Sequence, residues 1–315
     1  MGRATQFVYL VGGYQILSQV VPMCTTIYNT LYNETPLKER LNTRYGGEGE
    51  WALITGSSEG IGKSYALELA RAGYNLTICS RSTDKLEKVA EEARNENPNI
   101  KTRVVRLDVS SAGGDEYANL FNEQERTTIV VNNAGTLTNK PFFKLEPAII
   151  EGMIKTNVVP YVLMSKYALL HFMRTRDSHT HRNAITFTSS MASCASLANT
   201  QVYTGTKTFN AVFANTLRMQ AKKHPKLRDL LDVQSLHPAA VSTRLVTRTG
   251  GDTVTPDACA RGALCDLSAN VLMSFGALEH TIIGRTVSQL TGWSPDLNKM
   301  VGNSRYADKP SPSQN

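Results

Sequence analysis

The fold of this chain is decided by the stretch WALITGSSEGIG, which covers residues 51–62. Its first four residues are apolar and predict a buried strand, and its glycines permit a tight turn in which a pyrophosphate can approach backbone N–H groups. An amphipathic segment over residues 63–72 then predicts a helix whose N-terminus carries partial positive charge. This order is typical of a dinucleotide-binding site. The candidate contacts are Gly56, Ser57, Ser58, Gly60, Ile61 and Gly62.

Beyond this stretch, short apolar strands alternate with amphipathic helices. Strands are predicted at 75–80, 102–109, 128–131, 184–188 and 233–236, and helices at about 83–95, 147–174 and 203–222, with a kink at Pro160. The alternation predicts an α/β fold: a Rossmann-like, doubly wound parallel sheet with helices on both faces. We expect one domain over 45–300, an N-terminal segment and connector over 1–44, and a tail over 301–315. The connector, over about 34–50, is polar.

Composition excludes several classes of protein. With 41% hydrophobic and 19% charged residues, the chain is neither disordered nor a polytopic membrane protein. The five cysteines include no C-x-x-C pair, which favours a reduced compartment. Residues 166–228 hold ten Lys or Arg against one acid, which indicates either solvated surfaces or attraction to an anionic cofactor, substrate or membrane. No basic run is interleaved with aromatics, so we expect no nucleic-acid partner.

The N-terminal segment is uncharged from residue 4 to residue 33. It is long enough to cross a bilayer, but Gln15, Ser18, Gln19, Pro22 and Asn29 make insertion marginal. We therefore expect a membrane-associated N-terminal helix. Three basic residues between 38 and 44 favour a cytosolic position for the rest of the chain.

The ends of the next strands supply further candidates for cofactor binding. Arg81 follows the second strand with no acid beside it, which favours NADP(H) over NAD(H) because arginine accommodates a 2′-phosphate. Asp108 could cap the adenine amine, or it could be a plain turn residue. Asn133, Ala134 and Gly135 end the fourth strand with small or amide side chains that let the backbone approach a cofactor.

Tyr203 and Lys207 lie one helical turn apart, so their side chains share a helix face. An ammonium near a phenol lowers the pKa of the phenol, which makes Tyr203 a candidate acid for a carbonyl or base for an alcohol. Such a pair alone is often a plain surface pair. Ser190 follows the fifth strand and can hydrogen-bond the same substrate oxygen, and Asn157, within the long helix, can hold a water.

In order and spacing, these motifs resemble the short-chain dehydrogenase/reductase family over about residues 51–243. The resemblance implies that Tyr203 protonates the carbonyl while hydride passes from the nicotinamide, and that Lys207 binds the ribose and lowers the pKa of the tyrosine. It also implies that Ser190 polarises the carbonyl and that Asn157 holds a proton-relay water.

The stretch PAAVST, residues 238–243, is similar to the family's Pro-Gly-x-Val-x-Thr at the nicotinamide. This likeness implies that Pro238, Val241 and Thr243 contact the cofactor. Ala239 replaces the usual glycine, which leaves the loop conformation open.

Within that family, the chain resembles membrane-bound 3-oxoacyl-CoA reductases of very-long-chain fatty-acid elongation and 17β-hydroxysteroid dehydrogenases of types 12 and 3. The likeness rests on the apolar N-terminal extension, on YGGEGEWA at 45–52, on Arg81, on PDACA at 256–260 and on GALEH at 276–280. The polar C-terminal stretch over 285–315 departs from those relatives.

We therefore expect NADPH-dependent reduction of a carbonyl on a lipid-like substrate, with 3-oxoacyl-CoA as the first candidate and a 17-oxosteroid as the second. A non-catalytic structural subunit of a membrane assembly is the alternative of a different class.

Further expectations concern the surroundings of the site. Residues 243–272 are expected to form a substrate lid, and the helices with Asn157 and Tyr203 to form a homodimer interface or a contact within a membrane complex. The resemblance implies an endoplasmic-reticulum membrane with a cytosolic catalytic domain, and a mitochondrial membrane is the alternative. His179 and His181 have no third ligand in register, so we expect no metal site there.

Overall fold

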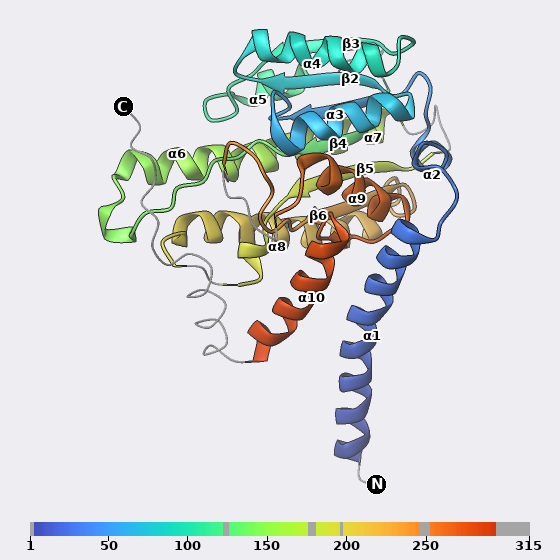
Figure 1. Cartoon of the computed structure of the whole chain (residues 1–315), viewed down its shortest axis with the longest axis vertical. Coiled ribbons are helices and arrows are strands. Elements are labelled where there is room, and N and C mark those ends of the chain that lie inside the picture. Colours follow the sequence, from blue (N-terminus) through green and yellow to red (C-terminus); the bar gives the residue numbers. More distant parts are fainter. Residues whose placement is uncertain (1–2, 122–125, 176–180, 196–197, 246–252, 294–315) are drawn as a thin grey trace.

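The computed structural model describes residues 3–121, 126–175, 181–195, 198–245 and 253–293 (Figure 1). One parallel sheet forms its centre. The strands are β1 (Trp51–Thr55), β2 (Asn75–Ser80), β3 (Thr102–Arg106), β4 (Thr127–Asn132), β5 (Asn183–Thr188), β6 (Leu231–Leu236) and β7 (Met273–Ser274). They lie in the order β3-β2-β1-β4-β5-β6-β7, which confirms the predicted doubly wound sheet. Successive strands are added on one side of β1 up to β3 and on its other side from β4 onward. Open α/β sheets bind ligands at such a switch point, at the carboxyl ends of the strands.

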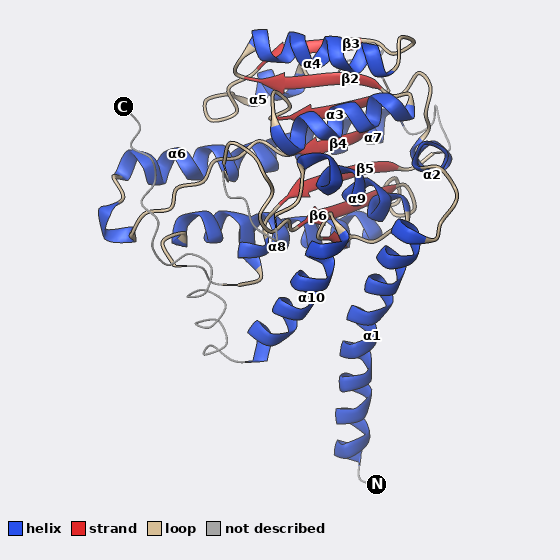
Figure 2. Cartoon of the chain, viewed as in Figure 1, coloured by secondary structure: helices blue, strands red, loops and turns tan. Residues whose placement is uncertain are grey.

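Helices cover both faces of the sheet (Figure 2). They are α1 (Arg3–Leu31), α2 (Leu37–Tyr45), α3 (Gly60–Ala72), α4 (Thr83–Glu96), α5 (Gly114–Ala118), α6 (Pro147–Asn157), α7 (Val159–Thr175), α8 (Gln201–Lys223), α9 (Pro256–Ser268) and α10 (Leu278–Trp293), with short 3₁₀ turns η1 (Phe142–Lys144) and η3 (Met191–Ser193). Side chains of β1 alternate between two cores. Ile54 packs with α2, α3, α4 and α9, whereas Leu53 packs with α5, α7 and α8.

The predicted long helix over 147–174 is two helices. The first, α6, ends at Asn157, and α7 begins at Val159, so the break falls just before Pro160 instead of at it. Proline is tolerated in the first turn of a helix because its missing N–H would have no partner there. The break leaves the Asn157 carbonyl free of the helix ladder, and it accepts a hydrogen bond of 3.0 Å from Asn210 Nδ2.

The predicted polar connector contains a core helix, which sequence reasoning missed. Leu37, Leu41 and Tyr45 of α2 recur every fourth residue, and all three are buried against the sheet. The charged residues between them hide this stripe when composition alone is considered. The segment that leads into β1 is therefore part of the folded domain.

The predicted substrate lid is wrong over its helical part. Cys259, Ala263 and Leu264 of α9 are completely buried, and this helix packs along α3. Their spacing is that of a helix face turned to a core. Residues 256–268 are therefore scaffold, and residues 246–252 of the expected lid lie outside the described part of the chain.

The expected N-terminal helix is present as α1. Figure 1 shows it extending away from the sheet on the same side as α10. Its last turns pack on α9 and α10, where the Thr26 hydroxyl donates a 2.6 Å hydrogen bond to Asp266 Oδ1. Among the described residues, no helix combines the length and apolar character needed to cross a membrane.

Candidate active site

The glycine loop between β1 and α3 is pressed against the end of β4. Gly56 has a φ of +65°, and a Cβ on it would lie 2.8 Å from Ala134 Cα. A Cβ on Gly62 would lie 2.3 Å from the Gly56 carbonyl oxygen. Both contacts are shorter than any side chain tolerates, so these two positions require glycine.

Two polar side chains hold this loop in shape. Asn133 Nδ2 donates to the carbonyl oxygens of Thr55 (3.1 Å) and Gly56 (3.2 Å). The buried Ser57 hydroxyl lies 3.3 Å from the carbonyl oxygens of Ile54 and Cys79. We expected Asn133 and Ser57 to contact a cofactor, and their side chains are occupied within the protein. The backbone N–H groups in the first turn of α3 have no partner within the helix, and these are the donors suited to a pyrophosphate.

The end of β2 carries an exposed arginine beside a structured carboxylate. Arg81 is exposed and follows Ser80, the last residue of β2. Asp108 accepts hydrogen bonds from Ser110 N (3.0 Å) and Ser110 Oγ (2.7 Å). The Ser110 hydroxyl, with the nearby Arg81 and Arg106 charges, lowers the pKa of Asp108. Arg81 and Asp108 therefore lie close to each other at the edge where the adenosine half of a dinucleotide would bind.

Lys207 is buried between two tyrosine rings. Its Nζ lies 5.7 Å from the Tyr203 ring centroid and 5.4 Å from that of Tyr161. It donates to the Thr188 carbonyl oxygen at 2.7 Å and lies 3.4 Å from the Tyr161 hydroxyl. Burial lowers the pKa of Lys207 to about 7. The predicted Tyr203–Lys207 pair therefore shares one helix face, next to a second tyrosine that sequence reasoning did not select.

Asn157 is completely buried, and its side chain is fully engaged. Its Oδ1 accepts from Thr136 N (2.8 Å), and its Nδ2 donates to Thr136 O (2.9 Å) and Thr206 Oγ1 (3.1 Å). A water held by this residue would have to use its main-chain carbonyl, whose oxygen has a second lone pair beside the bond from Asn210.

Gly135 lies between the lysine and the asparagine. A Cβ on Gly135 would be 3.3 Å from Lys207 Nζ and 3.4 Å from Asn157 Oδ1. Any side chain at this position would therefore crowd both groups, so glycine keeps the approach to Lys207 and Asn157 free of a Cβ. A small residue here suits the dinucleotide that the glycine loop predicts.

Ser190 begins the turn after β5. Its Oγ accepts a 3.2 Å hydrogen bond from Ala192 N and is partly exposed. The neighbouring Ser189 hydroxyl donates to the Lys207 carbonyl at 2.7 Å, which ties this turn to α8. Met191 N donates to Pro238 O at 2.9 Å, which ties the turn to the loop after β6.

The loop over 238–243 reaches from Ser190 to the glycine loop. The Thr243 methyl group lies 3.1 Å from the position of a Cβ on Gly60. Among described non-glycine residues, only Asn199 and Asn270 have positive φ, so Ala239 adopts an ordinary conformation. Its N–H donates to His280 Nδ1 at 3.3 Å. The alanine therefore replaces the family's glycine without backbone strain.

Comparison with known protein families supports a single assignment. A family profile described as short chain dehydrogenase matches residues 50–253. A very-long-chain 3-oxoacyl-CoA reductase of Caenorhabditis briggsae is 29% identical over 256 residues, which cover 79% of this chain and 78% of that protein. The human protein of the same name is 29% identical over 253 residues, 78% of this chain and 77% of the relative.

Solved structures show the same fold. A short-chain dehydrogenase of Sphingobium yanoikuyae in complex with NADPH superposes with a TM-score of 0.67 at 22% identity, covering 83% of this chain and 98% of that one. An alcohol dehydrogenase of Thermococcus sibiricus complexed with 5-hydroxy-NADP gives a TM-score of 0.59 at 26% identity, covering 69% and 90%.

Proposed function

This chain belongs to the short-chain dehydrogenase family and is an oxidoreductase, and from this premise we propose that it uses NADPH to reduce the 3-oxo group of a long-chain acyl-CoA. The observation that carries the proposal is that the buried Lys207 lies beside the Tyr203 ring, with Gly135 close to both Lys207 and Asn157. The substrate class is supported by the nematode and human relatives, whose names specify very-long-chain 3-oxoacyl-CoA reduction.

In the proposed reaction, NADPH supplies the hydride and the protein handles the proton. Tyr203 donates its hydroxyl proton to the carbonyl oxygen, to which the Ser190 hydroxyl also donates a hydrogen bond. Lys207, which carries its proton below its pKa of about 7, stabilises in that form the phenolate that remains. Thr188 and Tyr161 hold Lys207 in position for this role.

We assign cofactor binding to three groups of residues. The first turn of α3 would bind the pyrophosphate, and Lys207 the nicotinamide ribose. Arg81 is exposed where the adenosine ribose is expected, and its charge suits the 2′-phosphate that distinguishes NADPH from NADH. The loop over 238–243 would cover the nicotinamide.

An assay of NADPH oxidation with a panel of 3-oxoacyl-CoA substrates tests the proposal. We expect Tyr203→Phe to lower kcat by about 10²- to 10⁴-fold, because the proton donor is lost. Tyr167→Phe is the matched control, since Tyr167 lies on α7 outside the site and should leave kcat unchanged. Unchanged turnover in Tyr203→Phe would refute the mechanism.

Two further arms separate the remaining alternatives. A 17-oxosteroid in the same assay tests steroid reduction. NADPH binding without turnover on any carbonyl would favour the non-catalytic subunit.

We also propose that α1 associates with a membrane and that the chain is a homodimer or part of a membrane complex. Tyr14, Ile16 and Leu17 on α1 are more than half exposed, as is Val212 on α8. Endoplasmic reticulum is the first candidate compartment and mitochondria the second. Fractionation of cells that express a tagged chain tests the location, and mass photometry of the purified protein tests the dimer.

A further inference from the structure

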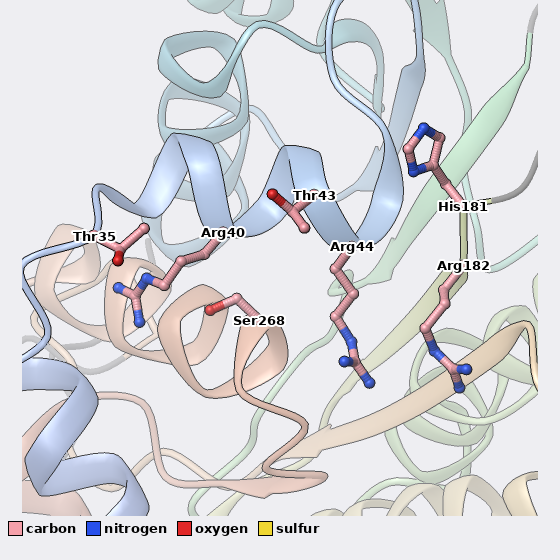
Figure 3. A pocket seen from close by; sticks show the side chains of 7 residues that line it. All are labelled: Thr35, Arg40, Thr43, Arg44, His181, Arg182 and Ser268. Carbon is pink, nitrogen blue, oxygen red and sulfur yellow. The ribbon is translucent and has the colours of Figure 1, made fainter.

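Each residue that lines a pocket at the amino-terminal edge of the sheet has a side chain that can donate a hydrogen bond (Figure 3). Its volume is about 490 Å³, and its lining residues are Thr35, Arg40, Thr43, Arg44, His181, Arg182 and Ser268. Arg182 directly precedes β5, whereas the glycine loop follows the carboxyl end of β1. Because the strands are parallel, the pocket and the proposed active site lie at opposite edges.

Among the described residues, the arginines of the pocket outnumber the carboxylates that pair with them. The buried carboxylate of Asp232 lies 2.8 Å from Arg44 Nε and 2.6 Å from Arg182 Nη2. Burial alone would raise the pKa of Asp232, but the hydrogen bonds from both arginines lower it, so the group is an anion at neutral pH. One carboxylate thus faces two guanidinium groups, and no acidic side chain lines the pocket.

Arg40 adds a third guanidinium without adding an acid. It lies one turn before Arg44 on α2, and its hydrogen-bond partners among the described residues are neutral: Nη1 donates to Asn29 Oδ1 at 3.1 Å and Nη2 to Cys265 Sγ at 3.4 Å. Its Nε is buried, with no hydrogen-bond partner among the described residues. A buried donor without an acceptor is costly, so this group favours a ligand that supplies one.

We propose that this pocket binds a phosphate group. Planar guanidinium groups bind phosphate oxygens through paired hydrogen bonds, and hydroxyl side chains add further donors. The lining offers donors and positive charge, which matches a ligand that offers only acceptors and negative charge. The phosphate belongs either to a soluble small molecule or to an anionic lipid headgroup. A lipid is a candidate because Thr35 lies in the segment that joins α2 to α1, the helix proposed to associate with a membrane.

Calorimetric titration of the full chain with pyrophosphate, in saturating NADPH and at constant ionic strength, tests the site. We expect saturable binding that Arg40→Gln weakens about tenfold or more, because a charge-assisted hydrogen bond is lost. Lys38→Gln is the control: it makes the same charge change on the same helix, but Lys38 faces Glu48 at 3.8 Å and does not line the pocket. The affinity of Lys38→Gln for pyrophosphate should stay within about twofold of the wild-type value, because an exposed charge outside the pocket contributes little.

A second variant keeps the test informative if Arg40→Gln fails to fold. Thr43 is exposed, so Thr43→Glu should fold while placing a carboxylate in the pocket, and we expect it to abolish binding. Equal affinities of the wild type and these variants would overturn the proposal. The test does not depend on the proposed function, because neither position lies at the glycine loop.

Sedimentation with phosphatidylcholine vesicles, with and without phosphatidic acid, separates the two sources of phosphate. Arg40-dependent binding to phosphatidic acid that pyrophosphate competes away identifies a lipid headgroup. Arg40-dependent binding of pyrophosphate, with vesicle binding indifferent to Arg40, identifies a soluble ligand. Indifference to Arg40 in both arms would refute the site.

Discussion

At the scale of single residues, the chemistry depends on the environment of Lys207 more than on its distance from Tyr203. The side chain is 3% exposed, and burial lowers its pKa to about 7. The Thr188 carbonyl and the Tyr161 hydroxyl occupy two of its three donor positions. The third donor position is the one that the proposed cofactor would use.

The lowered pKa predicts a pH-dependent stability. Between about pH 7 and pH 10, the unfolded chain holds a proton on Lys207 that the folded chain lacks, so stability rises with pH by up to about 1.4 kcal/mol per unit. Lys207→Met should remove this rise, which urea unfolding at several pH values would measure. Lys155→Met, at an exposed position on α6, should retain it. Parallel pH profiles of wild type and Lys207→Met would contradict the prediction.

The sequence predicted the residues of the proposed site but not Tyr161, which helps to hold Lys207 in position. Tyr203, Lys207, Asn157 and Ser190 stand in recognisable spacing, and the structure gathers Lys207 with Tyr203 and Asn157. Tyr161 lies in an apolar stretch where an aromatic residue suggests only core packing. Its contact with Lys207 depends on how α7 crosses α8, which no local pattern encodes.

At the scale of elements, six of the seven strands were predicted within three residues, and the two-residue β7 was not predicted. The helices were predicted less well: α2 was missed, the helix over 147–174 is two helices, and the role of α9 differs from the one expected. The strand ends follow from runs of apolar residues that the sheet buries completely, as in β4 and β5. The role of α9 could not be predicted, because its apolar face has the spacing of any amphipathic helix and only the tertiary structure shows that α3 covers it.

A buried hydrogen bond between Thr26 and Asp266 helps to hold α1 on the domain. Thr26→Val removes the donor to Asp266 Oδ1, and we expect the free energy of unfolding to fall by about 1–3 kcal/mol. The loss should be larger at pH 8 than at pH 5, because burial raises the pKa of Asp266 to about 6 and the ionised carboxylate needs its donors most. Urea unfolding at pH 5 and pH 8 measures the loss in the free energy of unfolding and its pH dependence. Thr30→Val, at an exposed position of α1, is the control. Equal stability of the two variants would show that this bond does not hold α1.

At the scale of the whole molecule, Asp232 joins segments that are distant in sequence. Its carboxylate accepts from Arg44 and Tyr45 at the end of α2 and from Arg182 before β5. The Tyr45 hydroxyl also lies 3.1 Å from the Leu267 carbonyl oxygen of α9. The N-terminal, central and C-terminal parts of the chain therefore meet at one buried charge.

Loss of that charge should destabilise the entire domain. We expect Asp232→Asn to cost about 3 kcal/mol at pH 7, because it leaves two partly buried arginines without the buried anion that they share. Since the folded pKa is lowered, the stabilisation is present above the unfolded pKa near 4 and is lost as pH falls through the folded value. Chemical unfolding at pH 7 measures the cost, and Asp229→Asn, at an exposed neighbouring acid, serves as control. A loss no larger than that of the control would contradict this role.

The hydrogen bonds that Asn133 donates to Thr55 and Gly56, at the start of the glycine loop, bear on the thermodynamics of binding. They set the loop conformation during folding, so the conformational entropy of the loop is lost before any ligand arrives. A dinucleotide that meets a preorganised loop avoids that ordering cost. Removal of the Asn133 amide would thus appear in calorimetry as a less favourable entropy of binding, because its hydrogen bonds to Thr55 and Gly56 would no longer order the loop beforehand.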